Sequence, residues 1–325
     1  MIRLILKDKM SRTGKTKILV TGGSGLIGAA LANYLVKKGY IVNVLDMAPC
    51  LDIEGINYFQ GSILSKTDIA KAMDGCDYVF HLAALLGVKY STDNALKCLD
   101  VNVIGTRNVL QEAVNEGVKK VVFASSSEVY GEQGIDEKIK ETAVLRPISE
   151  YGFSKCLGEE YCKAFKQKYD LDYGIIRFFN IYGPNQALKF VMPLFIHHAL
   201  EKKPIQVFGN GSQKRCFCYV EDAVKGIAEV MFNRDEDNQI FNIGNDKEAI
   251  SMFEMAKKVS DLVGCEAEPI KVPFEESDRE ETREIYNRIG DITKAKEVLG
   301  FEPKISIEEG IRRIIDYGCN FKSQS

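Results

Sequence analysis

The sequence predicts an α/β protein built on a doubly wound parallel sheet, and three observations lead to that prediction. Residues 17–21 form a short β-rich run, residues 26–38 then show helical spacing of apolar positions, and Gly39 ends this helix. Short apolar runs bounded by turn signals continue to alternate with helix-length segments. Such alternation produces βαβ units, in which the strands are parallel and helices cover the sheet.

The later segments continue the alternation of strands and helices as far as residue 184, and a different pattern follows. Further strands are expected at residues 41–45, 78–82, 121–125 and 175–179, and long helices at 95–116 and 150–169. After Gly183 and Pro184, helices are expected at 192–202, 220–232, 253–263 and 307–317, with short strand-like pieces at 205–208 and 239–243. The chain is long enough for an α/β domain followed by a smaller, mixed region.

Composition and charge argue against several classes of function. The net charge of −3 argues against a general nucleic-acid or membrane-surface binder, and no apolar run approaches the ~18 residues of a membrane span. Nine cysteines, an odd number without a signal peptide, indicate reduced thiols and a cytoplasmic location. No CxxC pair occurs and there are only three histidines, so we expect no metal site.

The motif TGGSGLIG at 21–28 joins the first strand to the first helix. Gly22, Gly25 and Gly28 permit a tight turn, close approach of the backbone to a pyrophosphate, and close packing of helix on strand. Leu26 and Ile27 open the helix, whose N-terminus presents unpaired N–H groups to phosphate. The placement of the motif between strand and helix therefore predicts a dinucleotide site.

A carboxylate at the end of the second strand predicts which dinucleotide binds. Asp46 lies 18 residues after Gly28, where it can accept the ribose hydroxyls of NAD and repel the 2′-phosphate of NADP. We therefore predict NAD as the cofactor. The expected organisation is an N-terminal extension at 1–16, an NAD-binding Rossmann domain at 17–180, and a second region at 181–325 from which a strand or helix can return to the first domain.

Tyr151 and Lys155 are four residues apart and share one face of a predicted helix. An ammonium beside a phenol favours the phenolate and so lowers the pKa of the tyrosine. A tyrosine with a lowered pKa can take a proton from an alcohol. Taken alone, such a pair is more often found on a protein surface, so its meaning depends on the rest of the chain.

The ordered motifs of the chain resemble the extended short-chain dehydrogenase/reductase family, and within it the NAD-dependent sugar-nucleotide epimerase/dehydratase group. The resemblance runs from about residue 17 to residue 317. Its motifs are TGGSGLIG at 21–28, HLAA at 81–84, DVNVIGT at 100–106, SSSEVYG at 125–131, YGFSK at 151–155, RFFNIYGP at 177–184 and GSQKRCFCYVED at 211–222. This set is specific for the family and less specific for the substrate.

The resemblance implies catalytic roles for several side chains. Tyr151 would be the general base on a sugar hydroxyl, and Lys155 would bind the nicotinamide ribose and lower the pKa of the tyrosine. Ser126 would hydrogen-bond the reacting hydroxyl. Its neighbours Ser125 and Ser127 point to the opposite face if the strand alternates regularly.

The resemblance also implies the remaining cofactor and substrate contacts. Cofactor contacts are expected from Ser62, Ile63, Leu82, Ala83 and Ala84, where Ser62 replaces an Asp that many relatives carry for the adenine amine. Substrate contacts are expected from Ser126, Ser127, Asn180, Val191, Arg215 and Arg279, with Arg283 and Arg288 as competitors for the last role. Asn102 is expected to hold the active-site helix, and Cys216 and Cys218 to serve in packing.

Family members share a first step and differ in the later steps. The 4-hydroxyl of a nucleotide sugar loses a proton to Tyr151 while hydride moves to NAD, which leaves a 4-keto sugar. We expect 4-epimerisation or release of the 4-keto sugar. Glu128 also suits a decarboxylase of the UDP-glucuronate type or a structural role, whereas Ser127 replaces the Asp expected in a 4,6-dehydratase.

Other expectations concern partners and the possibility that the protein has no activity. The substrate would be a UDP- or GDP-type sugar bound by the region 181–325. The family resemblance suggests a homodimer packed through the helices at 95–116 and 150–169. A non-catalytic NAD-binding regulator is the remote alternative, and the presence of Ser126, Tyr151 and Lys155 in register argues against it.

Overall fold

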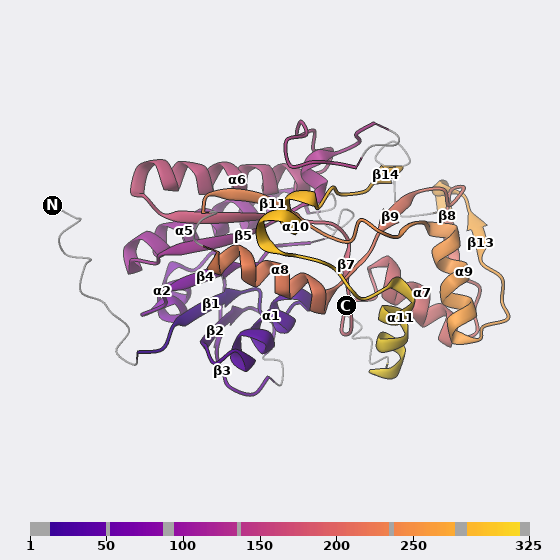
Figure 1. Cartoon of the computed structure of the whole chain (residues 1–325), viewed down its shortest axis with the longest axis horizontal. Helices are drawn as coiled ribbons and strands as arrows, with labels where there is room; N and C mark the ends of the chain where they lie inside the picture. The colour runs from indigo at the N-terminus through magenta and orange to yellow at the C-terminus, as the bar shows by residue number, and fades with distance from the viewer. Residues whose placement is uncertain are drawn as a thin grey trace.

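A parallel sheet of seven strands forms the centre of the protein. The computed structural model describes residues 14–49, 53–86, 94–134, 138–233, 237–276 and 285–318. The strand order is β11-β6-β5-β4-β1-β2-β3 (Figure 1). The strands are β1 (Lys17–Thr21), β2 (Ile41–Asp46), β3 (Ile56–Gln60), β4 (Tyr78–His81), β5 (Lys120–Ser126), β6 (Asp172–Phe178) and β11 (Gln239–Ile243). Every pairing in this sheet is parallel, which confirms the predicted fold class.

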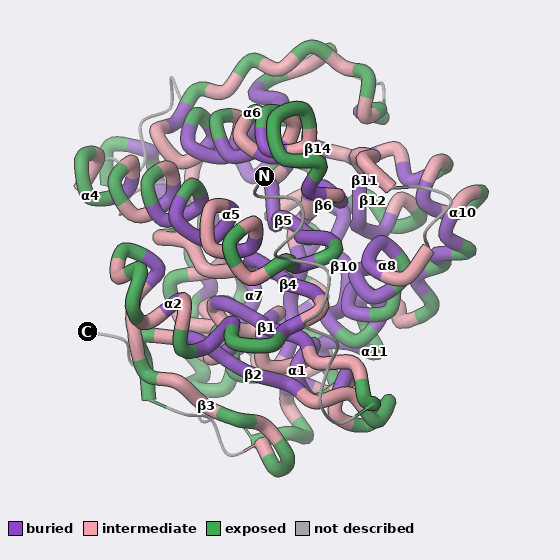
Figure 2. Tube along the Cα trace, turned by 90° about the vertical axis from the view of Figure 1, so that its left-hand side faces the viewer, coloured by how far each residue is buried: buried purple, intermediate pink, exposed green. Residues whose placement is uncertain are grey.

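Helices cover both faces of the sheet because alternate strand residues face opposite sides. In β1, Ile18 and Val20 join one apolar cluster and Leu19 joins the other. The first cluster includes side chains of α1 (Leu26–Lys37) and α8 (Val220–Phe232). The second includes side chains of α2 (Lys66–Met73), α5 (Gly105–Glu116) and α6 (Glu150–Tyr169). Figure 2 shows the buried strands between these helices.

The helix predicted at 95–116 has three consecutive parts. α4 (Ala95–Leu99) leads into a π-helical turn, η2 (Asp100–Ile104), which leads into α5. Turns of this kind are frequent at functional sites. The turn contains Asn102, whose side chain contacts both the loop after β4 and α6.

The second region consists of short strands and helices beside the main sheet (Figure 1). Its strands are β7 (Ile181–Tyr182), β8 (Gln206–Phe208), β9 (Lys214–Cys216), β10 (Cys218–Tyr219), β12 (Ala249–Ser251), β13 (Ile270–Val272) and β14 (Asn287–Arg288). Its helices are α7 (Val191–Leu200), α9 (Met252–Val263) and α11 (Ile307–Asp316). The helix α10 (Thr293–Leu299) lies instead beside β11 and α8 of the main sheet (Figure 1). The strand predicted at 239–243 does not remain there, because β11 returns to pair with β6.

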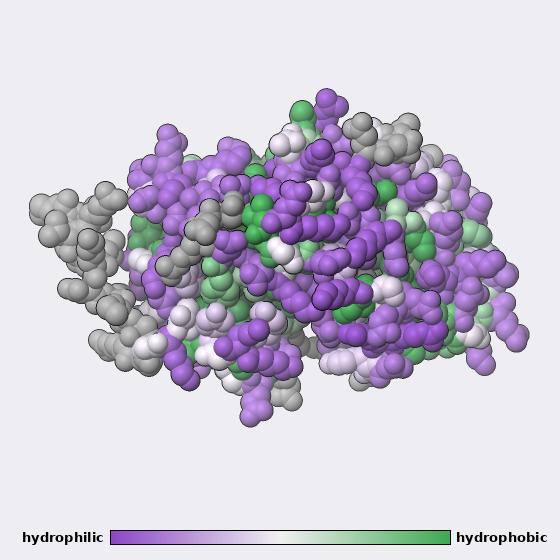
Figure 3. Space-filling model, viewed as in Figure 1, coloured by the Kyte–Doolittle hydropathy of each residue, from purple (hydrophilic) through white to green (hydrophobic). Residues whose placement is uncertain are grey.

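The surface is largely hydrophilic on the face that Figure 3 shows. Within the described ranges, no helix combines the length and apolar character needed to traverse a bilayer. The same ranges contain no group of three or more His, Cys, Asp or Glu side chains arranged to hold a metal ion.

Gly158 allows α6 to lie close to β5, and a methyl group there should separate them. An added Cβ would lie 2.3 Å from Cζ of Phe123, a buried ring of β5. Overpacking a filled core costs typically about 1–3 kcal/mol. We therefore expect Gly158→Ala to lower the free energy of unfolding by about that amount, as measured by urea unfolding.

Gly134→Ala is the matched control for this substitution, because an added Cβ at Gly134 meets nothing within 4 Å. We expect the control to unfold at the same urea concentration as the wild type or slightly above it. If Gly158→Ala were as stable as the wild type, the close packing of α6 on β5 would be wrong.

Candidate active site

The glycine loop between β1 and α1 forms a cradle with no room for side chains. At Gly22, φ is +75° and an added Cβ would lie 2.6 Å from N of Ala83. At Gly28, an added Cβ would lie 2.2 Å from O of Gly22. Gly25 is the N-cap of α1 and no side chain caps this helix, so its first N–H groups can bind an anion. This backbone cradle fits a diphosphate.

Asp46 lies at the end of β2 beside the glycine loop. Its Oδ2 accepts a hydrogen bond from N of Ser24 (2.8 Å), and its Oδ1 accepts one from N of Ala48 (3.0 Å). These bonds fix the carboxylate, and its remaining lone pairs can accept ribose hydroxyls. A fixed negative charge at this position suits NAD and opposes the additional phosphate of NADP.

The loop after β4 lies over the end of β1 and continues the cradle. N of Leu82 donates to O of Thr21 (3.1 Å), and N of Ala83 donates to Oγ1 of Thr21 (3.3 Å). Ala83 is also the residue that approaches Gly22 most closely. Leu82, Ala83 and Ala84 are therefore positioned as a wall beside the glycine loop, where the sequence predicts cofactor contacts.

Ser62 and Ile63 follow β3 and have local structural contacts. N of Ser62 donates to Asp68 (3.1 Å), and Oγ of Ser62 accepts from N of Leu64 (3.1 Å). The side chain of Ile63 is buried against the position of Gly105, where an added Cβ would lie 2.5 Å from its Cδ1. The hydroxyl of Ser62 can still donate a hydrogen bond, so its adenine contact stays a prediction.

The side chain of His81 connects the end of β4 to β1 and to α5. Its Nδ1 lies 2.8 Å from Oγ1 of Thr21, and its Nε2 lies 3.0 Å from Oγ1 of Thr106 in α5. Burial, together with the charge of Lys155, lowers the pKa of His81 to about 3. The imidazole is therefore neutral near pH 7 and serves as a hydrogen-bonding bridge.

Asn102 joins the loop after β4 to the helix that contains Tyr151. Its Oδ1 accepts from N of Leu85 (2.7 Å), and its Nδ2 donates to Oγ of Ser154 in α6 (3.0 Å). These contacts match the structural role that the sequence predicts for Asn102.

The tyrosine–lysine pair lies in the first turns of α6, next to the end of β5. Ser149 caps the helix by accepting from N of Gly152 (3.1 Å). Lys155 is buried, and its Nζ donates to O of Ala124 (2.7 Å) and lies 5.6 Å from the centroid of the Tyr151 ring. The phenol of Tyr151 is hydrogen-bonded to the side chain of Ser126. The structure thus brings Ser126, Tyr151 and Lys155 together.

The pKa of Tyr151 is raised in this structure, and the lowering effect expected of Lys155 stays a prediction. Burial, followed by the charge of Glu128, raises the pKa of Tyr151, and the hydrogen bond with Ser126 only partly opposes this. Burial also lowers the pKa of Lys155 to about 8. Desolvation is the largest cause of both pKa shifts, and the ammonium of Lys155 donates to the backbone carbonyl of Ala124.

The three neighbouring serines have different surroundings. Oγ of Ser125 donates to Oε1 of Glu159 (2.5 Å), and Ser127 is 3% exposed. Oγ of Ser126 accepts from N of Glu128 (3.2 Å). Ser126 is therefore the serine that faces the phenol of Tyr151.

Glu128 pairs with an arginine from the second region. It lies in η3 (Ser127–Tyr130), and its Oε1 pairs with Nη1 of Arg288 in β14. Its backbone also packs against α6, since an added Cβ at Gly152 would lie 2.9 Å from O of Glu128. Arg288 is 8% exposed, and its buried Nε has no hydrogen-bond partner among the described residues.

Among the described residues, the structure brings the cation Arg288 to Glu128. The sequence favoured Arg279 for the second cation and treated Arg288 as a competitor. Arg279 and Arg283 lie outside the described residues. The position of Arg288 depends on the pairing of β14 with β9, which no local sequence pattern reveals.

The second region contains or adjoins three residues that the sequence predicts as substrate contacts: Asn180, Val191 and Arg215. Nδ2 of Asn180 donates to O of Cys216 (3.0 Å), which places it beside β9. Arg215 in β9 is the register partner of Arg288, and its Nη1 donates to O of Lys214 (2.9 Å). Val191 begins α7 and is half-buried. Their expected contacts with a diphosphate sugar remain predictions.

Cys216 and Cys218 are buried on either side of Phe217. Burial raises the pKa of Cys216 to about 12 and raises that of Cys218 further. Both thiols therefore stay protonated near pH 7, which suits the packing role expected from the sequence.

Comparison with known proteins agrees with this geometry. The model of the NAD dependent epimerase/dehydratase family matches residues 18–244. A UDP-N-acetyl-alpha-D-glucosaminuronate decarboxylase from Bacillus cytotoxicus is 36% identical, and the match covers 93% of this chain and 98% of the relative. These matches confirm the family that the motifs predict, its NAD dependence and its enzymatic character.

Two solved structures are similar over nearly the whole chain. UDP-glucose 4-epimerase from Thermotoga maritima, solved with UDP-glucose, has a TM-score of 0.85 and 32% identity, covering 93% of this chain and 98% of that one. UDP-glucuronic acid 4-epimerase from Bacillus cereus, solved with UDP-glucuronic acid and NAD, has a TM-score of 0.84 and 28% identity, with the same coverage of 93% and 98%.

The lowered pKa of Lys155 predicts a specific pH dependence of stability. Between pH about 8 and 10.5 the amine is neutral in the folded protein and charged in the unfolded chain. The unfolded state then binds more protons, so the contribution of this group to stability rises from about pH 8 to pH 10.5 and is constant below that window. The change in the free energy of unfolding is at most about 1.4 kcal/mol per pH unit.

Lys155→Met isolates this contribution because it removes the titrating group. We expect the free energy of unfolding of the wild type, minus that of Lys155→Met, to rise from pH 8 to pH 10 and to be flat from pH 6 to pH 7. Urea unfolding at constant ionic strength measures the difference. A difference that stays constant up to pH 10 would mean that Lys155 keeps an ordinary pKa.

Proposed function

The chain belongs to the NAD-dependent epimerase/dehydratase family, and we propose that it oxidises a nucleotide-diphosphate sugar at carbon 4 and then epimerises that carbon or releases the 4-keto sugar. The main support is one observation: Ser126, Tyr151 and Lys155 meet at the carboxyl end of β5, at the edge of the sheet where the glycine loop follows β1. A hydrogen-bonded phenol next to a dinucleotide cradle is the arrangement that alcohol oxidation requires.

The chain's own residues account for the movement of the proton. Bound NAD supplies the acceptor for the hydride that leaves carbon 4. The O–H bond of the 4-hydroxyl breaks, its proton goes to Oη of Tyr151 as phenolate, and the oxygen becomes a ketone. Ser126 holds the same hydroxyl, and the Lys155 ammonium binds the nicotinamide ribose. Because burial raises the pKa of Tyr151, positive charge gained on cofactor binding must favour the phenolate.

A second candidate function is decarboxylation of a uronic acid, favoured by the pair of Glu128 and Arg288. The carboxylate on carbon 5 of a uronic acid is one carbon away from the new ketone, so it can leave as carbon dioxide. A buried guanidinium with an unpartnered Nε is suited to bind a carboxylate. The decarboxylase from Bacillus cytotoxicus supports this candidate by its 36% identity. Dehydration has less support because Ser127 stands where an Asp is expected.

We further propose a UDP sugar as the substrate, a homodimer and a cytoplasmic location. The similar structures from Thermotoga maritima and Bacillus cereus were solved with UDP sugars, which favours UDP over GDP. Leu96 and Ile104 are exposed on the α4–α5 side, and Phe153 and Leu157 are exposed on α6. Such a patch supports dimer packing through these helices.

Tyr151→Phe tests the proposed oxidation because it removes only the phenolic oxygen. With UDP-glucose and UDP-glucuronate as substrates, we expect turnover to fall by about 10²- to 10⁴-fold, the usual contribution of a general base. Mass spectrometry and chromatography of the nucleotide sugars, with absorbance of reduced nicotinamide, measure the products.

Tyr161→Phe is the matched control on the same helix, and we expect it to retain wild-type turnover. A product of unchanged mass with a new configuration would identify an epimerase, and loss of carbon dioxide would identify a decarboxylase. Undiminished turnover by Tyr151→Phe on every accepted substrate would rule out the proposed chemistry.

Arg288→Gln tests whether Arg288 binds a substrate carboxylate. If Arg288 binds a substrate carboxylate, KM for UDP-glucuronate should rise by about tenfold or more, whereas KM for UDP-glucose should change little, since a charged hydrogen bond is worth about 1.5–3 kcal/mol. Steady-state kinetics with both sugars measure the effect. Equal losses for both sugars would argue for a structural role of the Glu128–Arg288 pair.

A further inference from the structure

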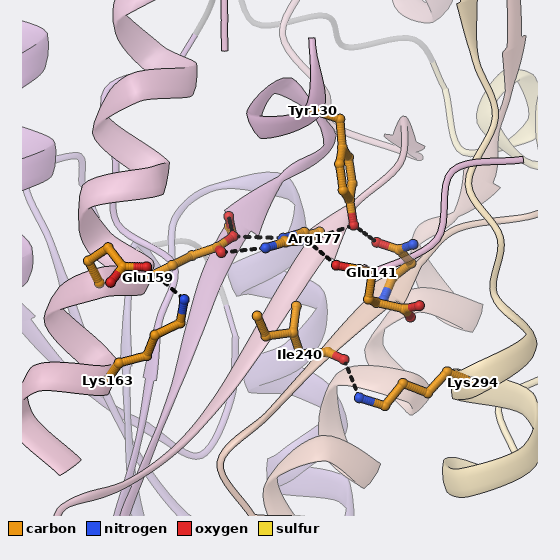
Figure 4. Close-up of polar contacts among 10 residues, drawn as sticks. Tyr130, Glu141, Glu159, Lys163, Arg177, Ile240 and Lys294 are labelled. Carbon is orange, nitrogen blue, oxygen red and sulfur yellow. Dashed lines mark hydrogen bonds and ion pairs between the residues drawn. The ribbon is translucent and has the colours of Figure 1, made fainter. Parts of the chain in front are cut away.

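A buried ion pair lies one helical turn beyond Lys155. Nε of Arg177 donates to Oε1 of Glu159 (2.9 Å), and Nη2 donates to Oε2 (2.6 Å), so the two groups meet as a fork. Glu159 is 0% exposed and Arg177 is 3% exposed. Figure 4 shows Arg177 between Glu159 on one side and Tyr130 and Glu141 on the other. Nothing in the oxidation at carbon 4 uses this pair directly.

On one side the pair fixes α6 to the sheet. Oγ of Ser125 donates to Oε1 of Glu159 (2.5 Å), and Ser125 is the register partner of Arg177 across β5 and β6. The carboxylate of Glu159 is therefore bonded by two side chains that face each other on the neighbouring strands β5 and β6. One turn earlier, Lys155 donates to O of Ala124. Two successive turns of α6 are thus bonded to the end of β5.

On the other side the pair reaches the turn that contains Glu128. Nη1 of Arg177 donates to Oη of Tyr130 (2.9 Å) and to O of Glu141 (2.9 Å). Oη of Tyr130 in turn donates to Oδ1 of Asn242 in β11 (2.7 Å). Tyr130 is the last residue of η3, two positions after Glu128.

Asn242 extends these contacts to the segment that carries Arg288. Its Nδ2 donates to O of Ile139 (2.9 Å) and to O of Asp291 (3.0 Å). N of Ile139 donates to O of Ile289 (2.8 Å), directly after Arg288. A series of buried and partly buried hydrogen bonds therefore runs from α6 to the end of β14.

We propose that Ser125, Tyr130, Glu159, Arg177 and Asn242, here called the Glu159–Arg177 network, are positioning residues that hold Glu128 and Arg288 in place relative to Tyr151. The inference rests on the proposed function, because the placement matters for what happens to the 4-keto sugar after oxidation. The network spans the helix with the proton acceptor, the turn with Glu128 and the segment after Arg288, and its side chains bond one another and the backbone.

Stability alone does not explain such a network. Burying two charges is costly, and an apolar pair of similar volume is often as stable as a buried ion pair or more stable. Directed hydrogen bonds differ from apolar contacts in fixing orientation. A displacement of reacting groups by about 1 Å can reduce the rate by about 10²-fold, so orientation at this place affects turnover.

Tyr130→Phe tests the network because it removes one hydroxyl and keeps the ring. We expect kcat to fall by about tenfold, a moderate fraction of what misplacement can cost, with KM changed by less than about threefold. We also expect reduced nicotinamide to accumulate during turnover, because steps after oxidation slow more than oxidation itself. Hydrogen exchange should become faster in residues 285–291.

Tyr182→Phe is the matched control. Its hydroxyl is equally buried but donates to O of Ser306 (3.3 Å) and O of Ile307 (3.4 Å), outside the network. We expect this control to keep the wild-type kcat, nicotinamide signal and exchange in residues 285–291. If Tyr130→Phe matched the control in all three measurements, the positioning role would be wrong.

The double substitution Glu159→Leu with Arg177→Met separates positioning from stability. We expect it to approach the wild-type midpoint of urea unfolding and still to show the kcat loss and the faster exchange. Recovery of both stability and turnover by this apolar pair would overturn the proposal. If the wild type turned over no nucleotide sugar, the proposed function would fail, and hydrogen exchange would still decide whether the network holds residues 285–291.

Discussion

The anchoring of α6 to the carboxyl end of β5 is the constraint on which the rest of the site depends. Gly158 lets the helix approach the ring of Phe123, and Lys155 bonds the carbonyl of Ala124. Because the helix can approach this closely, the phenol of Tyr151 reaches Ser126, the residue at the end of the same strand. A helix held farther from the sheet would keep its sequence motif and lose the hydrogen bond between these two side chains.

Sheet topology explains why the cofactor cradle lies at the same edge. The carboxyl ends of parallel strands meet at one side of the sheet, and the strand order changes direction between β1 and β4. The glycine loop follows β1, Asp46 ends β2, and Leu82–Ala84 follow β4, so all three face the crevice at this change. Burial there has opposite effects on the two titrating groups, raising the pKa of Tyr151 and lowering that of Lys155. A charged ligand bound near Tyr151 and Lys155 should therefore change the pKa values of both groups.

Local sequence patterns predicted those parts of the structure that are formed by residues close together in the sequence. Strand and helix alternation predicted the parallel sheet, and the spacing of Gly22, Gly25 and Gly28 predicted the cradle. The contact of Arg288 with Glu128 joins residues 160 positions apart, and the pairing of β14 with β9 that allows it has no local signal. The return of β11 to the main sheet was foreseen only as a possibility for the same reason. The burial that raises the pKa of Tyr151 has no local signal either, because spacing indicates a neighbouring charge and does not indicate burial.

The most direct test of the central claim is a rapid-mixing measurement with a nucleotide sugar deuterated at carbon 4. We expect reduced nicotinamide to form more slowly from this sugar than from the unlabelled one, and deuterium at carbon 5 to leave this rate unchanged. Reduction at the same rate with and without deuterium at carbon 4, or a rate that responds only to deuterium at carbon 5, would contradict oxidation at carbon 4 by the site around Tyr151.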